Sequence, residues 1–329
     1  MYFELWQRNR LKNMIDKVVV IGGSGFLGSH TADELTRRGF KVVIFDQNES
    51  PWLSNDQEMV VGDILDLNTL LSVLDGAKYL YHFAGISDIA DALNRPFETI
   101  NLNIMGATTA LEAARIAGVD RFLYASTMYV YSPFGSFYRA SKQSVETIIE
   151  AYQEHYGFHY TLLRYGSLYG PRAQEWNGLR KYVSQVVNTG KLEYFGTGKE
   201  RREYIHVKDA ARLSADVLDD KHRNKAITVT GSQVLSSSEL IELIFEIAGK
   251  EKVVTFSGVE REGYHYTMTP YRYTPKHAQK LVPGEFIDLG QGVLELVEEI
   301  HDEIIDEALP LLSSVMDFFR LLNWLETEN

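Results

Sequence analysis

The chain has 329 residues, of which 45% are hydrophobic and 24% are charged, and this globular composition excludes disorder as its overall state. Its formal net charge of −12 disfavours nonspecific binding to nucleic acids or to anionic membranes. Because the sequence contains no cysteine, disulfides, thiolate nucleophiles and thiolate metal sites are excluded.

No segment of the sequence has the character of a membrane span or a secretory signal. The longest run without charge, 122–138, contains Pro133, Gly135 and several hydroxyls, and residues 1–13 lack an uninterrupted apolar core. Met14 is an alternative start just before the first strand. We therefore expect a soluble, cytoplasmic protein with no membrane or nucleic-acid partner. The nine histidines form no ligand-like cluster, so no metal site is expected.

Apolar runs of strand length alternate with helical stretches through the first half of the chain. The predicted strands are rich in Val, Ile, Leu, Tyr and Phe and cover residues 17–21, 41–46, 58–61, 79–82, 121–125 and 160–164. The predicted helices between them cover residues 25–38, 67–74, 96–117 and 137–155. This alternation implies parallel pairing through right-handed crossovers, and hence an α/β fold with a doubly wound parallel sheet.

After about residue 166 the pattern is less regular. Helices are expected over 178–188, 207–218, 238–248 and 289–309, and strands over 192–195 and 226–230. Ser237 or Ser238 is expected to cap the helix at 238–248. Pro310 is expected to end the acidic helix at 289–309. The apolar tail 311–325 contains Asp317 and Arg320, which favours a packing or oligomer helix over a membrane anchor.

The same pattern predicts two domains. The first, residues 14–170, holds most of the sheet, and some later elements return to it. The second, residues 171–329, is a smaller α+β lobe followed by the C-terminal helices.

The strongest local signal is a strand that runs directly into a glycine loop and a helix, Val18-Val19-Val20-Ile21-Gly22-Gly23-Ser24-Gly25-Phe26-Leu27-Gly28. Gly22 would make the turn, Gly25 would admit a pyrophosphate at the helix N-terminus, and Gly28 would let helix and strand pack closely. Phe26 and Leu27 open the helix and belong to the same predicted cofactor site. The alternative is a purely structural turn.

Two strand ends near this loop carry carboxylates. Asp46 ends the next strand, 18 residues after Gly28, where a carboxylate accepts hydrogen bonds from the adenosine ribose hydroxyls and repels a 2′-phosphate. This favours NAD over NADP, the alternative being a solvated turn residue. Asp63, with Ile64 beside it, follows the third strand and is placed to meet the adenine edge.

A phenol and an ammonium share one face of a predicted helix, since Tyr138 and Lys142 stand at i and i+4. Free tyrosine has a pKa near ~10, so a phenol that accepts a proton near neutrality needs the help of a cation. Lys142 would supply it. Thr127 ends a predicted strand at the ligand-binding edge of the sheet and could hydrogen-bond the substrate oxygen. A solvated helix face is the alternative for the Tyr138/Lys142 pair.

From about residue 17 to residue 293 the chain resembles the extended short-chain dehydrogenase/reductase family, in its NAD-dependent nucleotide-sugar epimerase and dehydratase branch. The matching motifs are Gly22-x-x-Gly25-x-x-Gly28, Asp46, Gly62-Asp63, His82-Phe83-Ala84-Gly85, Asn103-x-x-Gly106, Ser126-Thr127, Tyr138-x-x-x-Lys142, Leu163-Arg164-Tyr165, Tyr169-Gly170-Pro171-Arg172 and Arg202-Glu203-Tyr204-Ile205-His206-Val207-x-Asp209.

The resemblance implies a Rossmann-type NAD domain and a C-terminal lobe that holds a nucleoside diphosphate sugar. It makes Tyr138 the general base, Lys142 the ligand of the nicotinamide ribose and Thr127 the family's Ser/Thr residue. The remaining cofactor residues that it implies are Phe83, Ala84, Gly85 and Tyr165, with Asn103 in support. The substrate residues that it implies are Thr127, Ser167, Arg202 and Arg272.

Departures from the family pattern narrow the reaction. In 4,6-dehydratases the catalytic Thr is followed by Asp and Glu, where this chain has Met128 and Tyr129, and the Glu common in sugar-acid decarboxylases is also missing. The remaining chemistry is oxidation at a carbinol carbon, rotation of the keto sugar and hydride return, which describes a 4-epimerase. The alternatives are a reductase or dehydrogenase, a dehydratase or decarboxylase with relocated acid/base groups, and a non-catalytic NAD-binding sensor.

Two more features bear on the substrate and the assembly. Tyr138 follows Thr127 after only 11 positions, which predicts a trimmed rim and an open sugar pocket, and Ser167 stands where the family often has Asn. The nucleotide and the sugar are therefore not assigned. Relatives usually pair two long helices per subunit, here 96–117 and 137–155, so the resemblance implies a homodimer.

Overall fold

The computed structural model describes residues 15–257, 265–271 and 278–306. Within these ranges one sheet has eight strands in the order β13-β10-β6-β5-β4-β1-β2-β3, and every neighbouring pair is parallel. The strands are β1 (Lys17–Ile21), β2 (Lys41–Asp46), β3 (Gln57–Val61), β4 (Ala77–His82), β5 (Arg121–Thr127), β6 (Tyr160–Tyr165), β10 (Lys225–Val229) and β13 (Ala278–Leu281). The predicted doubly wound parallel sheet is confirmed.

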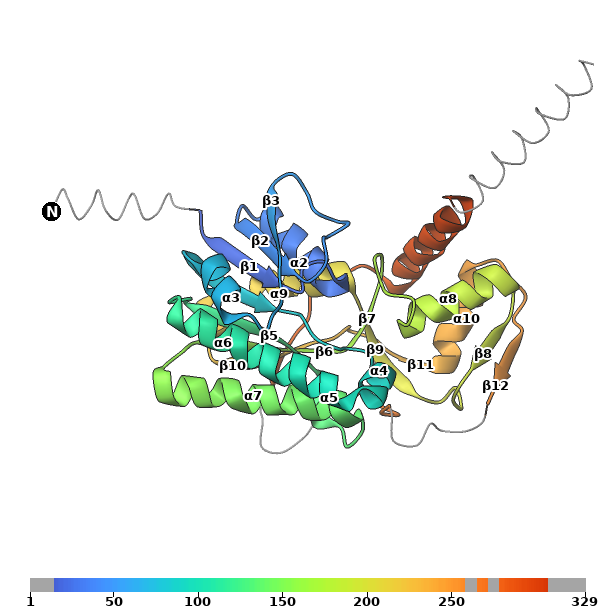
Figure 1. Ribbon diagram of the computed structural model, residues 1–329. Coiled ribbons are helices and arrows are strands. Elements are labelled where there is room, and N and C mark those ends of the chain that lie inside the picture. Colours follow the sequence, from blue (N-terminus) through green and yellow to red (C-terminus); the bar gives the residue numbers. More distant parts are fainter. Residues whose placement is uncertain (1–14, 258–264, 272–277, 307–329) are drawn as a thin grey trace, which may run out of the picture.

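Helices cover both faces of this sheet (Figure 1). On one face lie α2 (Phe26–Arg37) and α9 (Val207–Asp216), and on the other lie α3 (Leu67–Leu74), α6 (Ala107–Ile116) and α7 (Ser136–Tyr156). Strand β1 shows why both faces are apolar. Val18 and Val20 join the first core, whereas Val19 and Ile21 join the second, because successive strand side chains point to opposite faces.

The prediction of one continuous α-helix over 96–117 is wrong in one respect, because a π-helix interrupts the α-helix there. After α4 (Ile89–Asn94) come α5 (Pro96–Thr99), the π-helix η1 (Ile100–Gly106) and α6. A π turn does not interrupt the apolar periodicity, so the sequence pattern does not reveal it. The turn carries the buried Asn103, in keeping with the frequent occurrence of π turns at functional sites.

A smaller lobe follows the sheet. Its helices α8 (Gly178–Thr189), α10 (Ser237–Ile247) and residues 289–306 enclose a separate apolar core. Its strands form two small sheets, β11 (Val234–Ser236) with β9 (Arg201–His206) and β7 (Ser167–Tyr169), and β12 (Val254–Phe256) with β8 (Leu192–Tyr194). The short helices η2 (Met128–Tyr131) and η3 (Asp220–His222) lie in connections.

The lobe also corrects one predicted cap. Ser236, and not Ser237 or Ser238, caps α10, because its hydroxyl accepts a hydrogen bond from the Glu239 backbone while the Glu239 carboxylate accepts one from the Ser236 backbone. The helix predicted over 289–309 is described to residue 306, and the tail 311–325 lies outside the described residues. The domain boundary after residue 170 stays a prediction, although β10 and β13 belong to the main sheet.

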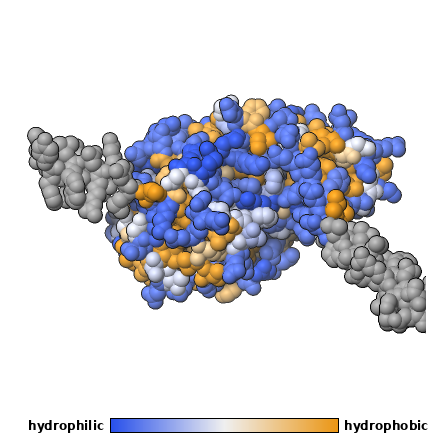
Figure 2. Space-filling view, turned by 90° about the horizontal axis from the view of Figure 1, so that it is seen from above, coloured by the Kyte–Doolittle hydropathy of each residue, from blue (hydrophilic) through white to orange (hydrophobic). Residues whose placement is uncertain are grey.

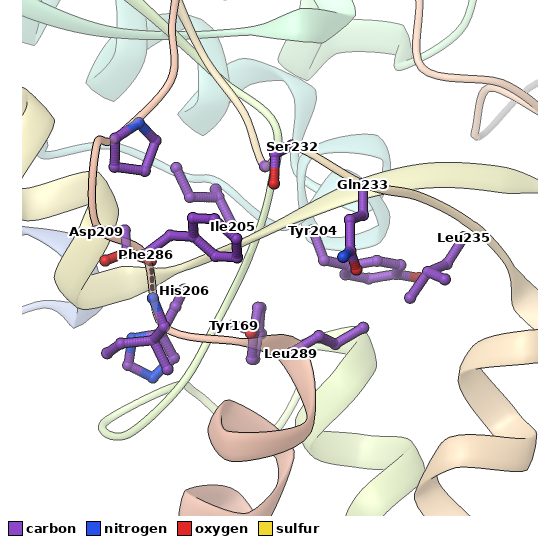
Figure 3. Close-up of a pocket in the computed structure, with 13 residues that line it drawn as sticks. Tyr169, Tyr204, Ile205, His206, Asp209, Ser232, Gln233, Leu235, Phe286 and Leu289 are labelled. Atoms are coloured by element: carbon purple, nitrogen blue, oxygen red, sulfur yellow. Dashed lines mark hydrogen bonds between the residues drawn. The ribbon is translucent and has the colours of Figure 1, made fainter.

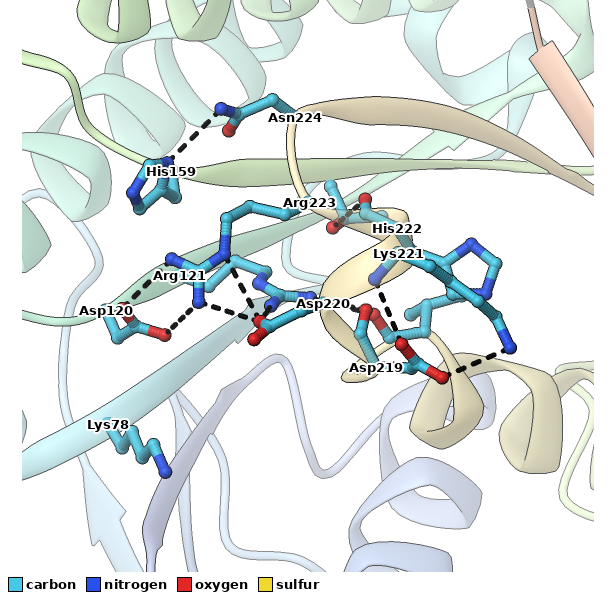
Figure 4. Close-up of polar contacts among 12 residues, drawn as sticks. Lys78, Asp120, Arg121, His159, Asp219, Asp220, Lys221, His222, Arg223 and Asn224 are labelled. Carbon is cyan, nitrogen blue, oxygen red and sulfur yellow. Dashed lines mark hydrogen bonds and ion pairs between the residues drawn. The ribbon is translucent and has the colours of Figure 1, made fainter.

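A polar cluster fixes the amino-terminal edge of the sheet (Figure 4). The buried Arg121, the first residue of β5, donates to the carbonyl oxygen of Val217 at 2.9 Å and to Oδ1 of Asp220 at 2.6 Å. Arg223 pairs with Asp120 at 3.1 Å. These bonds tie the connection between α9 and β10 to β5, at the edge of the sheet opposite to the strand carboxyl ends.

The molecular surface is of mixed character. On the face shown in Figure 2 hydrophilic residues predominate, and hydrophobic residues gather in smaller areas between them. Of the helices that the structure describes, none combines the length and the apolar character needed to cross a bilayer.

Candidate functional site

A cleft of about 840 Å³ opens between the carboxyl ends of the sheet strands and the smaller lobe. Most of the predicted site residues line it, namely Gly22, Gly25, Phe26, Leu27, Phe83, Thr127, Tyr138, Lys142, Tyr165, Ser167 and Arg202. Five others lie outside its lining, namely Asp46, Asp63, Ile64, Ala84 and Gly85. Arg272 lies outside the described residues. The position agrees with the rule that open parallel sheets bind ligands at their carboxyl edge.

The glycine loop leaves no space for a side chain at Gly22 or at Gly28. Gly22 has a φ of +80°, and a Cβ there would lie 2.5 Å from the backbone nitrogen of Ala84. A Cβ on Gly28 would lie 2.1 Å from the Gly22 carbonyl oxygen. Helix α2 begins after Gly25 without a capping side chain, so its first N–H groups are available at the cleft. Such a cradle of backbone donors fits the pyrophosphate of a dinucleotide.

Asp46 lies beside this loop at the end of β2. Its Oδ2 accepts a hydrogen bond from the Ser24 backbone N–H at 3.1 Å, and its Oδ1 accepts one from the Asn48 backbone N–H at 3.2 Å. The carboxylate is therefore held at the rim of the phosphate cradle, one strand away from β1.

The other predicted adenine-side residues have structural contacts of their own. Asp63 is exposed and accepts a hydrogen bond from the Leu65 backbone N–H at 2.9 Å, and Ile64 is buried in the second core. Their roles in binding a nucleotide stay predictions.

Asn103 connects the strand end at β4 to the helix that carries the phenol. Its Oδ1 accepts from the Ile86 backbone N–H at 2.7 Å, and its Nδ2 donates to the Ser141 hydroxyl at 2.9 Å. A Cβ on Gly85, whose φ is +135°, would lie 2.5 Å from the same Oδ1. The glycine therefore permits the close approach of the amide that supports the site.

The structure brings the three predicted catalytic side chains together. Thr127, at the end of β5, forms a side-chain hydrogen bond with Tyr138. Lys142 lies one turn further along α7, with its Nζ 5.9 Å from the centre of the Tyr138 ring and 2.7 Å from the Ala125 carbonyl oxygen, to which it donates.

The ionisation of this group is shifted toward its neutral forms. Burial raises the pKa of Tyr138 to about 12, although the hydrogen bond from Thr127 opposes the shift. Burial lowers the pKa of Lys142 to about 8, and the negative charge of Glu146 opposes that shift.

A buried ion pair lies close to Lys142, and its acidic partner, Glu146, was not predicted from the sequence. Glu146 is fully buried and pairs with Arg164 at 2.7 Å, while the Ser126 hydroxyl donates to it at 2.5 Å. Its position four residues after Lys142, on the same face of α7, was the signal that could have identified it.

Arg202 projects from β9 into the cleft. Among the described residues no carboxylate forms an ion pair with it, and its guanidinium lies 4.9 Å from the centre of the Tyr266 ring. It also hydrogen-bonds the side chain of Tyr129. A cation without a carboxylate partner is suited to bind a phosphate through paired N–H donors.

The cleft also contains aromatic residues that the sequence did not single out. Tyr129, His265 and Tyr266 line its inner part, and Trp176 and Phe195, which are 47% and 56% exposed, line it as well. His265 and Tyr266 come from an irregular segment between β12 and β13, where no periodicity marks them. Exposed aromatic rings suit stacking against a base or a sugar.

A second cavity lies behind β9, next to α9 and residues 283–289 (Figure 3). Its volume of about 30 Å³ is enough for about one water molecule. Asp209 at its wall accepts a hydrogen bond from the Ile287 backbone N–H at 2.9 Å, which ties α9 to this segment. The cavity is too small for a nucleotide or a sugar.

Comparison with known proteins agrees with this geometry. Residues 18–230, more than half of the chain, match the NAD dependent epimerase/dehydratase family. A putative UDP-glucose 4-epimerase of Methanocaldococcus jannaschii is 26% identical over 85% of this chain and 97% of its own length. A UDP-N-acetyl-alpha-D-glucosaminuronate decarboxylase of Bacillus cytotoxicus is 26% identical over 71% of this chain and 81% of its own length.

Among solved structures, the UDP-glucose 4-epimerase of Thermotoga maritima, determined with UDP-glucose, has the same fold. Its TM-score is 0.77 at 23% identity, over 88% of this chain and 99% of the other. The glycine cradle, the grouping of Thr127, Tyr138 and Lys142, and the match over residues 18–230 lead to one assignment. The chain is an enzyme of the NAD-dependent epimerase/dehydratase family, with NAD as its cofactor.

Proposed function

We propose that this enzyme is a 4-epimerase of a nucleoside diphosphate sugar. The observation that carries the proposal is the convergence of Thr127, Tyr138 and Lys142 in the same cleft as the glycine loop and Arg202. One end of that cleft suits a dinucleotide and the other a diphosphate, with a proton-transfer group between them.

The residues that would hold NAD follow from their positions. The N–H groups at the start of α2 would hold the pyrophosphate, Asp46 the adenosine ribose, and Asp63 with Ile64 the adenine edge. The nicotinamide half would lie against Phe83 and Tyr165 in the cleft, with Lys142 on its ribose, and next to Ala84 and Gly85, which follow Phe83 in the chain. Bound NAD supplies the hydride acceptor and donor of the reaction.

The catalytic side chains would divide the proton transfer among them. Tyr138 would take the proton of the sugar 4-hydroxyl and later return one, while Thr127 would orient the sugar oxygen. Lys142 would stabilise the phenolate. Arg202 would bind the diphosphate and hold it in place while the keto sugar rotates in the cleft. Ser167 and Arg272 would be further substrate contacts.

The residue types at the site favour epimerisation over related reactions. Met128 and Tyr129 stand directly after Thr127, so no carboxylate is present there for the proton transfers of dehydration. A 4-epimerase needs only the one phenol, its ammonium and its hydroxyl partner. Some relatives are named epimerases and others decarboxylases, so an experiment has to distinguish the two reactions.

We further infer that two copies of the chain form a homodimer. Phe97, Ile100 and Met105 are 82%, 46% and 51% exposed on α5 and η1, and both elements pack against α7. Exposed apolar side chains in such a row favour burial in an interface.

The test is a screen of UDP-, GDP-, CDP- and dTDP-sugars with product stereochemistry read by NMR. We expect inversion at C4 without net NADH formation, because the hydride returns within each turnover. Stoichiometric NADH formation, or consumption of added NADH, would identify a dehydrogenase or reductase instead.

In the same screen Tyr138→Phe is expected to lower turnover by about 100-fold or more while NAD stays bound. Tyr156→Phe, which removes an exposed phenol at the far end of α7, is the matched control. NAD binding without sugar turnover in both proteins would favour a sensor.

A further inference from the structure

A second hydrogen-bonded pair lies in the cleft beside the proposed base. The hydroxyl oxygen of Tyr129 is 2.5 Å from Nδ1 of His265, and both residues line the cleft. The rings of Tyr129 and Tyr138 meet edge to face with centres 6.1 Å apart. Two phenols, one assisted by a hydroxyl and an ammonium and the other by an imidazole, therefore face the same space.

The backbone holds His265 in this position. The Arg201 N–H donates to the Thr267 carbonyl oxygen at 2.7 Å, and the Thr269 N–H donates to the Arg201 carbonyl oxygen at 3.2 Å. This pairing with β9 fixes the segment after residue 264 against the lobe. Tyr266 follows His265 at the cleft and packs with its ring centre 4.5 Å from that of Tyr129.

The groups around Tyr129 favour the protonated form of its hydroxyl. Arg202 hydrogen-bonds its side chain, so the guanidinium donates to the phenol oxygen, and among the described residues no carboxylate is seen to pair with Tyr129. The phenol oxygen, which accepts from Arg202, also lies within hydrogen-bond distance of Nδ1 of His265. Burial raises the pKa of Tyr129 and so favours the protonated phenol, which can donate its hydroxyl hydrogen to Nδ1 of His265.

We propose that Tyr129 and His265 form a second acid–base pair that exchanges a proton at a carbon next to the transient ketone of the sugar. This rests on the proposed function, because oxidation at C4 is what makes the hydrogens at C3 and C5 acidic. Tyr138 acts on the oxygen at C4, and the Tyr129–His265 pair acts on a neighbouring carbon.

The step is a proton relay. The Tyr129 oxygen takes the proton from C3 or C5 as its own hydroxyl proton moves to Nδ1 of His265. The electrons of the broken C–H bond enter the ketone and give an enolate, whose oxygen Thr127 and Tyr138 can hydrogen-bond. Reversal of the relay returns a proton to the same carbon, so no further reactant is consumed. When the imidazolium has exchanged its proton with solvent, the returned proton comes from solvent.

The experiment measures deuterium uptake during turnover in D₂O. UDP-glucose and UDP-N-acetylglucosamine serve as probes, and NMR and mass spectrometry read the deuterium at C3, C4 and C5 of the recovered sugars. Hydride return places no solvent deuterium at C4, whereas the relay places it at C3 or C5. The quantity compared between variants is the ratio of carbon exchange to C4 inversion.

Two variants separate a chemical role from a positioning role. Tyr129→Phe removes the hydroxyl, and His265→Asn keeps a hydrogen-bonding group near Nδ1 but removes the basic nitrogen. Both are expected to lower the ratio by about 100-fold, the size of a lost general acid–base group. Tyr156→Phe is the control and is expected to leave it unchanged.

The outcomes distinguish the two proposals. C4 inversion without deuterium at C3 or C5 overturns this inference and leaves the proposed function standing. Exchange that survives in Tyr129→Phe or in His265→Asn also overturns it, because another group is then the carbon base. Absence of any turnover with either probe and with the wider nucleotide-sugar screen overturns both.

Discussion

Tyr138 and Lys142 lie in surroundings that disfavour their charged forms, and this has a direct chemical consequence. With a pKa of about 12 the phenol is protonated at neutral pH, and with a pKa of about 8 the ammonium is largely charged. A phenolate therefore forms only when positive charge stabilises it. Lys142 supplies one charge, and its own charge is favoured by Glu146 one turn away.

Asp46 makes discrimination between dinucleotides testable. In the proposed NAD site, Asp46→Ala would remove a charge-assisted hydrogen bond to the ribose, worth about 1.5 kcal/mol. We expect the preference for NAD over NADP to fall by about tenfold, measured as the ratio of two Kd values by calorimetry. Asp56→Ala, in the exposed loop that follows, is the control. An unchanged ratio in Asp46→Ala would show that another residue reads the ribose.

His82 links burial to acid stability. It is fully buried between the rings of Phe122 and Tyr124, and burial, with the charge of Lys142, lowers its pKa to about 3. The unfolded chain, with a histidine pKa near ~6.5, takes up the proton first as the pH falls, so stability present above that pH is lost below it.

Between pH 7.5 and 5.5 this histidine is expected to cost about 1.4 kcal/mol of unfolding free energy. His82→Phe should reduce the pH dependence of denaturant unfolding by that amount. A variant with the same dependence as the wild type would mean that His82 is protonated in the folded protein.

Side chains that belong to motifs were predictable, whereas those positioned by tertiary contacts were not. Thr127, Tyr138 and Lys142 were identified from spacing and strand position, and all three line one cleft. His265 reaches the same cleft from a segment without a recognisable pattern, because tertiary contacts position it, namely the pairing of Thr267 and Thr269 with Arg201 and its own hydrogen bond with Tyr129. Such long-range backbone contacts leave no local signal in a sequence.

The turn from β1 into α2 has no space for an added Cβ at Gly28, so a single methyl group is expected to affect both folding and NAD binding. In Gly28→Ala the new Cβ would meet the Gly22 carbonyl oxygen at 2.1 Å, so the helix must move away from the loop. We expect a loss of about 2 kcal/mol in unfolding free energy, together with loss of NAD binding. Gly284→Ala, which has no heavy atom within 4 Å of the added Cβ, is the control. Equal melting temperatures and NAD affinities for the two variants would refute this role of Gly28.

Helices and strands were predictable where local pattern and tertiary structure agree. Strands β1, β2, β4, β5 and β6 follow apolar runs that are largely buried on both faces, as parallel strands inside a sheet require. Strand β13, Ala278–Leu281, was missed because its Ala-Gln-Lys-Leu sequence has no such run and pairs only at the sheet edge. The π turn at Asn103 was missed because it preserves the apolar periodicity around it.

At the level of the whole protein, the proposed homodimer makes a prediction about mass. Phe97→Asp places a carboxylate at the most exposed residue of the apolar row on α5 and η1, and we expect it to convert a dimer into a monomer. Light scattering coupled to size exclusion measures the change. Val61→Asp, an equally simple substitution at an exposed apolar residue of β3, should leave the dimer intact. A monomeric wild-type protein would contradict the proposed interface.

The overall architecture was predictable because alternating strands and helices allow few topologies. The division of the chain between the main sheet and the smaller lobe was harder to predict. Strands β10 and β13 join the main sheet after the chain has entered the lobe, and the cleft is closed on one side by residues that lie far from the glycine loop in sequence. The resemblance indicated the substrate class, but which sugar fits depends on these distant contacts.

The path of one hydrogen atom decides whether this site performs an internal oxidation and reduction. The measurement uses the active nucleotide sugar labelled with deuterium at C4 and follows the label by NMR. If a phenol at Tyr138 and a bound dinucleotide act together on C4, the inverted sugar retains its deuterium at that carbon. An inverted sugar that has lost the label to water or to free reduced cofactor would contradict this mechanism.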